Sequence, residues 1–315
     1  MTTPEATGRV AIGFPGQGTD ESEKMRRLFN EFPAAKETID QAEDTLNRPL
    51  LYLLIEERDS ARTTTREDQL RLYLGSAALW IVAEQEGIVR APKEKRVYYG
   101  ASAGELGALW AAGSYDFARG LELIDTRGEE MHKASIINPG EMLVASGLPF
   151  DEAMEIAKNI PGVYAVNDNP GGQSVFSGRP AGIALARQKV AEIWQEVKLH
   201  SPDIKVSAHT IDMGPATKKF KKAVKAKVEK RPESVFLGNQ AKPIRTRWGV
   251  RRHLVKQLRR PVRLRESAHV LYDEFGVRIF YDVGPGRVLA GQMRREFRKT
   301  VEVVSIMDEL LPDKK

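Results

Sequence analysis

Apolar positions along the chain form short runs that alternate with longer segments of helical periodicity. Residues 9–14 are an apolar run that ends in a Pro-Gly-Gln-Gly turn, which predicts a strand followed by a glycine-rich turn. Helical repeats cover about 21–46 and 66–86. A second strand is expected at 96–99, with a tight turn at 100–104 and a small-residue helix directly behind it. This repeated order is typical of a parallel α/β sheet.

The middle of the chain has a different order of elements. Its strands and helices alternate as β-α-β-β-α-β, the order of a ferredoxin-like unit. The strands are expected at 141–147, 163–167, 173–177 and 204–208, and the helices at 150–159 and 181–197.

Basic helices at 215–230 and about 249–260, and a strand at 278–283, then return the chain to the large sheet. We therefore expect an α/β fold of two subdomains. The large α/β subdomain comprises 9–139 and 209–311, and the ferredoxin-like small subdomain comprises 140–208.

Composition limits the classes of protein that remain. Of 315 residues, 41% are hydrophobic and 29% charged, which is enough apolar material for a sizeable core. No apolar run approaches the roughly 18 residues of a membrane span, and the first residues lack the pattern of a secretory signal. The absence of Cys excludes a thiolate metal site and a cysteine nucleophile, and is compatible with the cytoplasm. The net charge of +6 indicates an acidic or phosphorylated partner, or an inert basic surface.

The turn at 100–104 matches G-x-S-x-G, in which a strained serine stands between a strand and a helix. Ser102 is therefore a candidate nucleophile, and the alternative is a turn without a chemical role. A serine nucleophile needs a base. His209 directly follows the strand expected at 204–208, where α/β enzymes place catalytic groups. The alternative is a histidine that only closes that strand. The other histidines are interpreted as a loop residue, His200, and solvated surface residues, His132, His253 and His269.

A series of motifs connects these residues to a known family. The motifs are FPGQG at 14–18, GASAGELGALWAAG at 100–113, TRGEEM at 126–131, VNDNPGGQSVFSG at 166–178, AHTIDMGPA at 208–216, VKQLRRPV at 255–262 and DVGPGRVLAGQMRR at 282–295. In this order they resemble malonyl-CoA:acyl carrier protein transacylases and the acyltransferase domains of fatty acid and polyketide synthases. The resemblance covers about 9–305 and implies a hydrolase-like parallel sheet with a ferredoxin-like insert.

The resemblance implies that Ser102 accepts the acyl group, His209 is the base and Arg127 binds the malonyl carboxylate. From the residues alone, Arg127 has an alternative as a surface residue that pairs with Glu129 or Glu130. The remaining implied site residues are Gln17 and Ala103 as backbone donors of the oxyanion hole, Gln257 as the residue whose carbonyl orients the histidine, and Asn167 in the acyl pocket.

The chain departs from the family next to the serine. Relatives usually carry a histidine immediately before the nucleophile, and here that residue is Ala101. Together with Ala103 and Ala208, this small side chain leaves room for a substituted malonyl group.

The activity implied by the resemblance is transfer of a malonyl group from coenzyme A to the phosphopantetheine thiol of an acyl carrier protein, through a malonyl-serine intermediate. The alternatives are an acyl hydrolase that acts on carrier proteins and a non-catalytic docking module of a synthase. No metal or redox cofactor, nucleic acid or membrane is implied. Acidic carriers and the phosphates of coenzyme A suit the basic runs at 218–231 and 245–265, although a solvated helix face also explains such runs.

Overall fold

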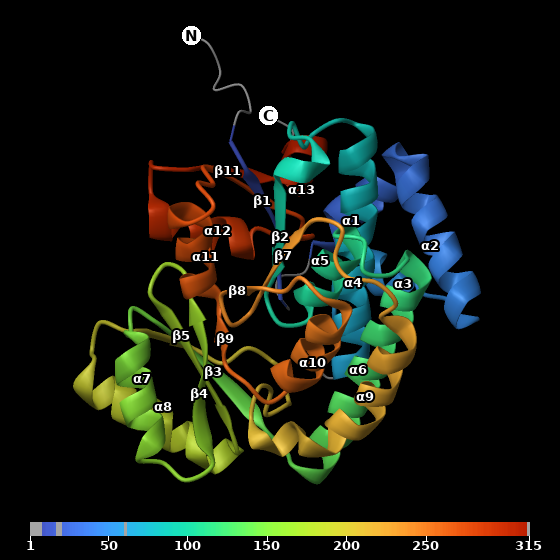
Figure 1. Ribbon diagram of the computed structural model, residues 1–315. Coiled ribbons are helices and arrows are strands. Elements are labelled where there is room, and N and C mark those ends of the chain that lie inside the picture. The colour runs from blue at the N-terminus through green and yellow to red at the C-terminus, as the bar shows by residue number, and fades with distance from the viewer. Residues whose placement is uncertain (1–7, 17–20, 60–61, 314–315) are drawn as a thin grey trace.

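A six-stranded sheet forms the frame of the computed structural model (Figure 1). The structure describes residues 8–16, 21–59 and 62–313. The strand order is β11-β10-β1-β2-β7-β8, and every neighbouring pair is parallel except β7 and β8. The bounds are β1 Val10–Phe14, β2 Arg96–Gly100, β7 Val235–Gly238, β8 Lys242–Pro243, β10 Ile279–Asp282 and β11 Glu302–Ser305.

The central strands β1 and β2 are buried on both faces, as a parallel sheet between helices requires. Successive side chains of a strand point to opposite faces. Accordingly, Ile12 and Tyr98 join one core cluster, whereas their neighbours Ala11 and Tyr99 join another.

Two groups of helices cover these faces. The second cluster packs against α11 Leu264–Asp273 and α12 Val288–Phe297. The first face is covered by α1 Ser22–Glu31, α2 Pro33–Leu46, α3 Tyr52–Ile55, α4 Thr65–Gln85, α5 Gly104–Ala111, α6 Phe117–Ile137, α9 Gly214–Lys227, α10 Arg247–Gln257 and α13 Ile306–Leu310. Within the described ranges, no helix is both long enough and apolar enough to cross a membrane.

A five-stranded sheet forms the smaller part of the molecule, with α7 Phe150–Lys158 and α8 Pro180–Ile193 packed on it around a core of its own. Its order is β6-β3-β5-β4-β9, antiparallel except for β4 and β9. The bounds are β3 Glu141–Ser146, β4 Val163–Asn169, β5 Gln173–Gly178, β6 Lys198–His200 and β9 Val262–Arg263. The predicted α/β fold class with two sheets is confirmed.

The helical periodicity over 21–46 is confirmed, and the structure divides that range into two helices. Phe32 separates α1 from α2 with an extended backbone, φ −124° and ψ 105°. Pro33 causes the break, since a residue before proline is pushed out of the helical region and proline suits the first helical position.

The strand expected at 204–208 is wrong. The strand that follows α8 in the small sheet is β6, which lies earlier along the chain, and 204–208 pairs with no strand. The alternating apolar residues Ile204, Val206 and Ala208 instead line a cleft beside Ser102. One-sided contact with a cleft gives the same period of two that a half-buried strand gives.

Candidate active site

A tight turn between β2 and α5 carries Ser102. Its φ of 52° lies in the left-handed region, which L-residues rarely adopt. A side chain at Gly104 would collide with the carbonyl oxygens of Phe14 and Pro15, and one at Gly100 would collide with the first residues of α5. The two glycines therefore allow the serine to stand in a strained turn at the start of a helix, the arrangement of a nucleophile elbow.

His209 faces the serine hydroxyl. Its Nε2 lies 2.7 Å from Oγ of Ser102, and its Nδ1 lies 2.8 Å from the main-chain carbonyl oxygen of Gln257. Because a carbonyl oxygen only accepts hydrogen bonds, Nδ1 carries the hydrogen and Nε2 keeps its lone pair. The serine hydroxyl can therefore donate to Nε2, which is the relation between a nucleophile and its base.

The surroundings of His209 keep its ring neutral. Burial, followed by the positive charge of Arg127, lowers the pKa of His209 to about 4. Main-chain hydrogen bonds and the charge of Glu105 act in the opposite direction but do not reverse the shift. At neutral pH the imidazole is unprotonated and can accept a proton.

Arg127 reaches the serine from α6 and is only 2% exposed. Its Nη2 donates to Oγ of Ser102 at 3.1 Å and to Oε1 of Gln257 at 3.0 Å. Its Nη1 donates to Oε1 of Gln69 at 2.6 Å. The structure thus brings together four residues that lie far apart along the chain.

The surface alternative for Arg127 does not hold, since Glu129 and Glu130 contact Lys133 instead. Burial lowers the pKa of Arg127 to about 10, which still leaves the guanidinium charged at neutral pH. Its hydrogen-bond acceptors are neutral, and no carboxylate of the described residues forms an ion pair with it. A buried cation without a counter-ion favours an anionic ligand.

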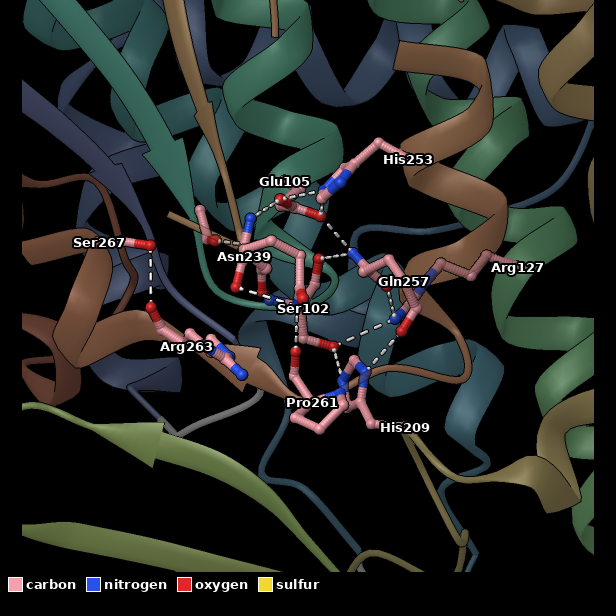
Figure 2. Close-up of polar contacts among 12 residues, drawn as sticks. Ser102, Glu105, Arg127, His209, Asn239, His253, Gln257, Pro261, Arg263 and Ser267 are labelled. Atoms are coloured by element: carbon pink, nitrogen blue, oxygen red, sulfur yellow. Dashed lines mark hydrogen bonds and ion pairs between the residues drawn. The ribbon is translucent and has the colours of Figure 1, made fainter. Parts of the chain in front are cut away.

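Glu105, in the first turn of α5, is fully buried behind the serine (Figure 2). Its carboxylate accepts from Nε2 of His253 at 2.7 Å, Nε2 of Gln257 at 2.6 Å and the backbone N–H of Asn239 at 2.7 Å. Burial by itself raises the pKa of Glu105, but His253 and the other donors outweigh it and hold that pKa below its usual value. Glu105 is therefore an ionised anchor for three donors.

The partners of Glu105 hold the serine turn. Asn239 accepts from the backbone N–H of Ser102 at 2.9 Å through Oδ1, and donates to the carbonyl of Gly100 at 2.6 Å through Nδ2. Nε2 of Gln257 also donates to the carbonyl oxygen of Ser102 at 2.7 Å. Hydrogen bonds on both peptide groups of the serine sustain its positive φ.

Of the two expected oxyanion donors, the structure describes Ala103 but not Gln17. Ala103 is buried and precedes the first residue of α5, where backbone N–H groups have no partner within the helix. Gln17 lies outside the described residues. Pro15 and Gly16, which precede it, line the cleft beside Ala101.

The serine opens into a cleft with about 750 Å³ of empty space. Asn167 lines it from β4, and its buried Oδ1 has no hydrogen-bond partner among the described residues. Ala101 and Ala208 also line it. Each contributes only a methyl group to the wall of the cleft next to the serine.

Two expectations for the other histidines are wrong. His253 is not a solvated surface residue, because its side chain is 12% exposed and bonded to Glu105. His269 is half-exposed and lies 2.7 Å from Glu296. His200 lies on β6 and not in a loop, and it is exposed.

Sequence reasoning missed four residues of the site: Gln69, Glu105, Asn239 and His253. Asn239 had a usable signal, since it directly follows the apolar run Val-Phe-Leu-Gly at the carboxyl end of a parallel strand. Glu105 had none, because an acidic residue in the first turn is an ordinary helix preference. Gln69 was inconspicuous in a helix that is buried almost all round.

Comparison with known proteins assigns this geometry to a family. The model of the acyl transferase domain matches residues 13–315, nearly the whole chain. The protein belongs to the acyl transferase domain family. The resemblance drawn from the sequence motifs is confirmed, and the protein is an acyltransferase enzyme.

Individual relatives resemble this acyltransferase along almost their full length. The malonyl CoA-acyl carrier protein transacylase of Bacillus subtilis is 29% identical over 306 residues, which covers 95% of this chain and 94% of the relative. The solved acyl-carrier-protein-S-malonyltransferase of Bartonella henselae is 26% identical and matches with a TM-score of 0.86, covering 96% and 98% of the two chains. A third match comes from a solved complex described as a type II polyketide synthase acyl-carrier protein with its malonyl-transacylase. The matching chain is 27% identical with a TM-score of 0.86, and the match covers 97% of this chain and 100% of that chain.

Proposed function

We propose that this acyltransferase moves a malonyl group from coenzyme A to the phosphopantetheine thiol of an acyl carrier protein, through a malonyl ester on Ser102. The observation that carries the proposal is Arg127, a buried cation without a carboxylate partner, 3.1 Å from a serine that is paired with a neutral histidine. Relatives are named for malonyl-CoA and acyl carrier protein, some of them for polyketide biosynthesis. The pathway served is fatty acid or polyketide synthesis.

In the first half-reaction, Oγ of Ser102 bonds to the thioester carbonyl carbon while its proton passes to Nε2 of His209. The carbonyl oxygen becomes an oxyanion at the start of α5, where the N–H of Ala103 is proposed as one donor and the N–H of Gln17 as the other. The C–S bond then breaks. Coenzyme A leaves as a thiol with the proton returned by His209.

The second half-reaction reverses these roles. The carrier's thiol gives its proton to Nε2 of His209, and its sulfur attacks the carbonyl carbon of the malonyl ester. When the C–O bond breaks, Oγ of Ser102 takes the proton back. Both half-reactions use the same base, whose position is set by the Gln257 carbonyl.

The malonyl carboxylate is proposed to pair with Arg127. A carboxylate in a buried cleft is costly without a partner, and a guanidinium can hold it through two parallel hydrogen bonds. Asn167 lines the same cleft and would contact the acyl group, since its Oδ1 is free to accept a hydrogen bond. Ala101, Ala103 and Ala208 leave room for a substituent on the malonyl group.

The reaction as proposed runs on side chains and backbone N–H groups and calls for no metal or redox cofactor. Its partners would be malonyl-CoA and an acidic carrier protein, and we place it in the cytoplasm. A carrier-directed acyl hydrolase would use the same serine and histidine, but it would not need the buried Arg127. A non-catalytic docking module would need neither Ser102 nor His209.

Intact-mass measurement after mixing with malonyl-CoA tests the proposal. The wild-type chain should gain one malonyl group, and Ser102→Ala should gain none. His209→Ala should acylate slower by several orders of magnitude, because an unassisted hydroxyl is a weak nucleophile. His200→Ala, a control on exposed β6, should behave as wild type. An adduct that persists in Ser102→Ala would remove the serine from the mechanism.

A further inference from the structure

A second concavity lies beside α10, apart from the serine cleft. It has about 940 Å³ of empty space and is bounded by β8, the segment that follows it and one face of α10. Among the described residues that line it, none is acidic and five are basic: Lys242, Arg245, Arg252, Lys256 and Arg260. We call this concavity the α10 pocket.

The positive charge of the α10 pocket is not neutralised within the described part of the chain, where none of the five basic side chains has a carboxylate partner. Desolvation, and after it the positive charges of Arg252 and Arg260, lower the pKa of Lys256. The first turn of α10 also faces the pocket through Thr246 and Gly249, and a helix N-terminus carries partial positive charge. Cations that crowd without counter-ions favour a ligand with several negative charges.

A flat aromatic side chain stands in the same pocket. Trp248 is 67% exposed, unusual for so large an apolar ring, and the guanidinium carbon of Arg252 lies 5.1 Å from its ring centroid. An exposed tryptophan among cations is the combination that stacks a nucleobase while the phosphates meet the basic side chains.

We propose that the α10 pocket binds a nucleotide with two or more phosphate groups. The size of the concavity suits a small molecule, the five cations match the phosphates, and Trp248 offers a stacking surface for the base. The mechanism proposed at Ser102 uses neither Trp248 nor any of the five cations, so the inference goes beyond that mechanism.

The inner wall of the pocket contains His253, whose Nε2 binds Glu105 behind the serine. This histidine is a reporter of where a ligand binds. A matched reference is His269, which also contacts a glutamate, Glu296 at 2.7 Å, but does not line the pocket.

Calorimetry with ADP on the full chain tests the proposal. We expect one ADP per chain, binding that weakens with salt, and roughly tenfold weaker binding of pyrophosphate, which lacks a base to stack. Trp248→Ala and Arg252→Glu should each lower ADP affinity at least tenfold. Lys221→Glu changes the charge by the same amount as Arg252→Glu, at an exposed position of α9, and should not lower ADP affinity. Arg127→Ala should also leave ADP binding unchanged.

The ring resonances of His253 should shift with ADP in an NMR titration while those of His269 stay in place. The proposal is overturned if ADP fails to bind, or if its affinity is the same in Trp248→Ala and Arg252→Glu as in wild type. Loss of binding in Arg127→Ala would assign the nucleotide to the serine cleft, which also overturns it.

Discussion

Gln257 contacts His209 with its main chain and Arg127 with its side chain. The carbonyl oxygen of Gln257 lies 2.8 Å from Nδ1 of His209, and Oε1 of the same residue accepts from Arg127 at 3.0 Å. Its Nε2 is committed to Glu105 and to the carbonyl of Ser102, so the amide cannot turn over without losing both bonds. The end of α10 therefore sets the tautomer of the base and the position of the buried cation together.

The low pKa of His209 predicts an unusual acid limb for self-acylation. Protonation removes the lone pair on Nε2, so kcat/KM should stay level as pH falls from neutral and decline only near pH 4, the folded-state pKa. An ordinary histidine would give the decline near 6.5. Circular dichroism at each pH separates this effect from acid unfolding.

The same measurement in Arg127→Ala uses acetyl-CoA, which does not need the arginine. Removal of the neighbouring positive charge and entry of water both favour the protonated ring, so the acid limb should move to higher pH. An acid limb at the same pH in both proteins would mean that Arg127 does not influence the base.

Arg127 should decide between malonyl and acetyl substrates. Arg127→Ala leaves the carboxylate of the malonyl group buried without a partner, at a cost of about 2–5 kcal/mol. Acetyl-CoA has no such carboxylate and does not incur this cost. The ratio of kcat/KM for malonyl-CoA to that for acetyl-CoA should fall by about 30-fold or more. Arg127→Lys should recover little of it, since a point charge does not reproduce a planar fork. An unchanged ratio would favour the hydrolase alternative.

Glu105 should act as a positioning residue. Glu105→Gln removes the charge and places an NH₂ group among donors, which should cost about 1–3 kcal/mol of unfolding free energy. Because Gln257 then loses its orientation, kcat for malonyl transfer should fall at least tenfold, while KM changes less. Glu129→Gln on the surface of α6 is the matched control and should change neither quantity. A loss of stability with normal kcat would reduce Glu105 to a structural role.

Transfer to the carrier should depend on salt more than acylation from coenzyme A does. Salt screens the encounter of two large charged surfaces more than the chemistry inside the cleft. Lys221→Glu with Lys222→Glu tests α9 as the docking face, and Arg252→Glu alone tests α10. Arg251 is left intact because it donates to the carbonyl of Val228 and supports the fold. If neither change slows transfer, neither basic run forms the docking face for the carrier.

Features that depend only on neighbouring residues along the chain could be predicted from the sequence. The elbow at Ser102 was found because a strand, two glycines and a helix lie within a few residues, and the break at Pro33 could have been read from the proline alone. The strand expected at 204–208 failed because contact with a cleft produces the same alternation as a sheet.

The network behind the serine could not be found in the same way. Glu105 and His253 lie 148 positions apart, and each has an ordinary local context, an acidic first turn and a basic helix. Only the tertiary fold shows that one is fully buried and that the other is its partner. Arg127 was placed by family resemblance, since its neighbours along the helix favoured a surface pair.

Val262 and Arg263 of β9 complete the small sheet by pairing with Asn167 and Asp168 of β4. Suppose that a chimera takes only 140–208 from a relative. The relative's β4 would then pair with β9 of this chain, a strand that evolved beside a different neighbour. Transplanting acyl preference would require moving 257–263 as well, and that segment begins with the residue that anchors the histidine. Substrate choice and activation of the base are thus inherited as a single unit wherever this fold diversifies.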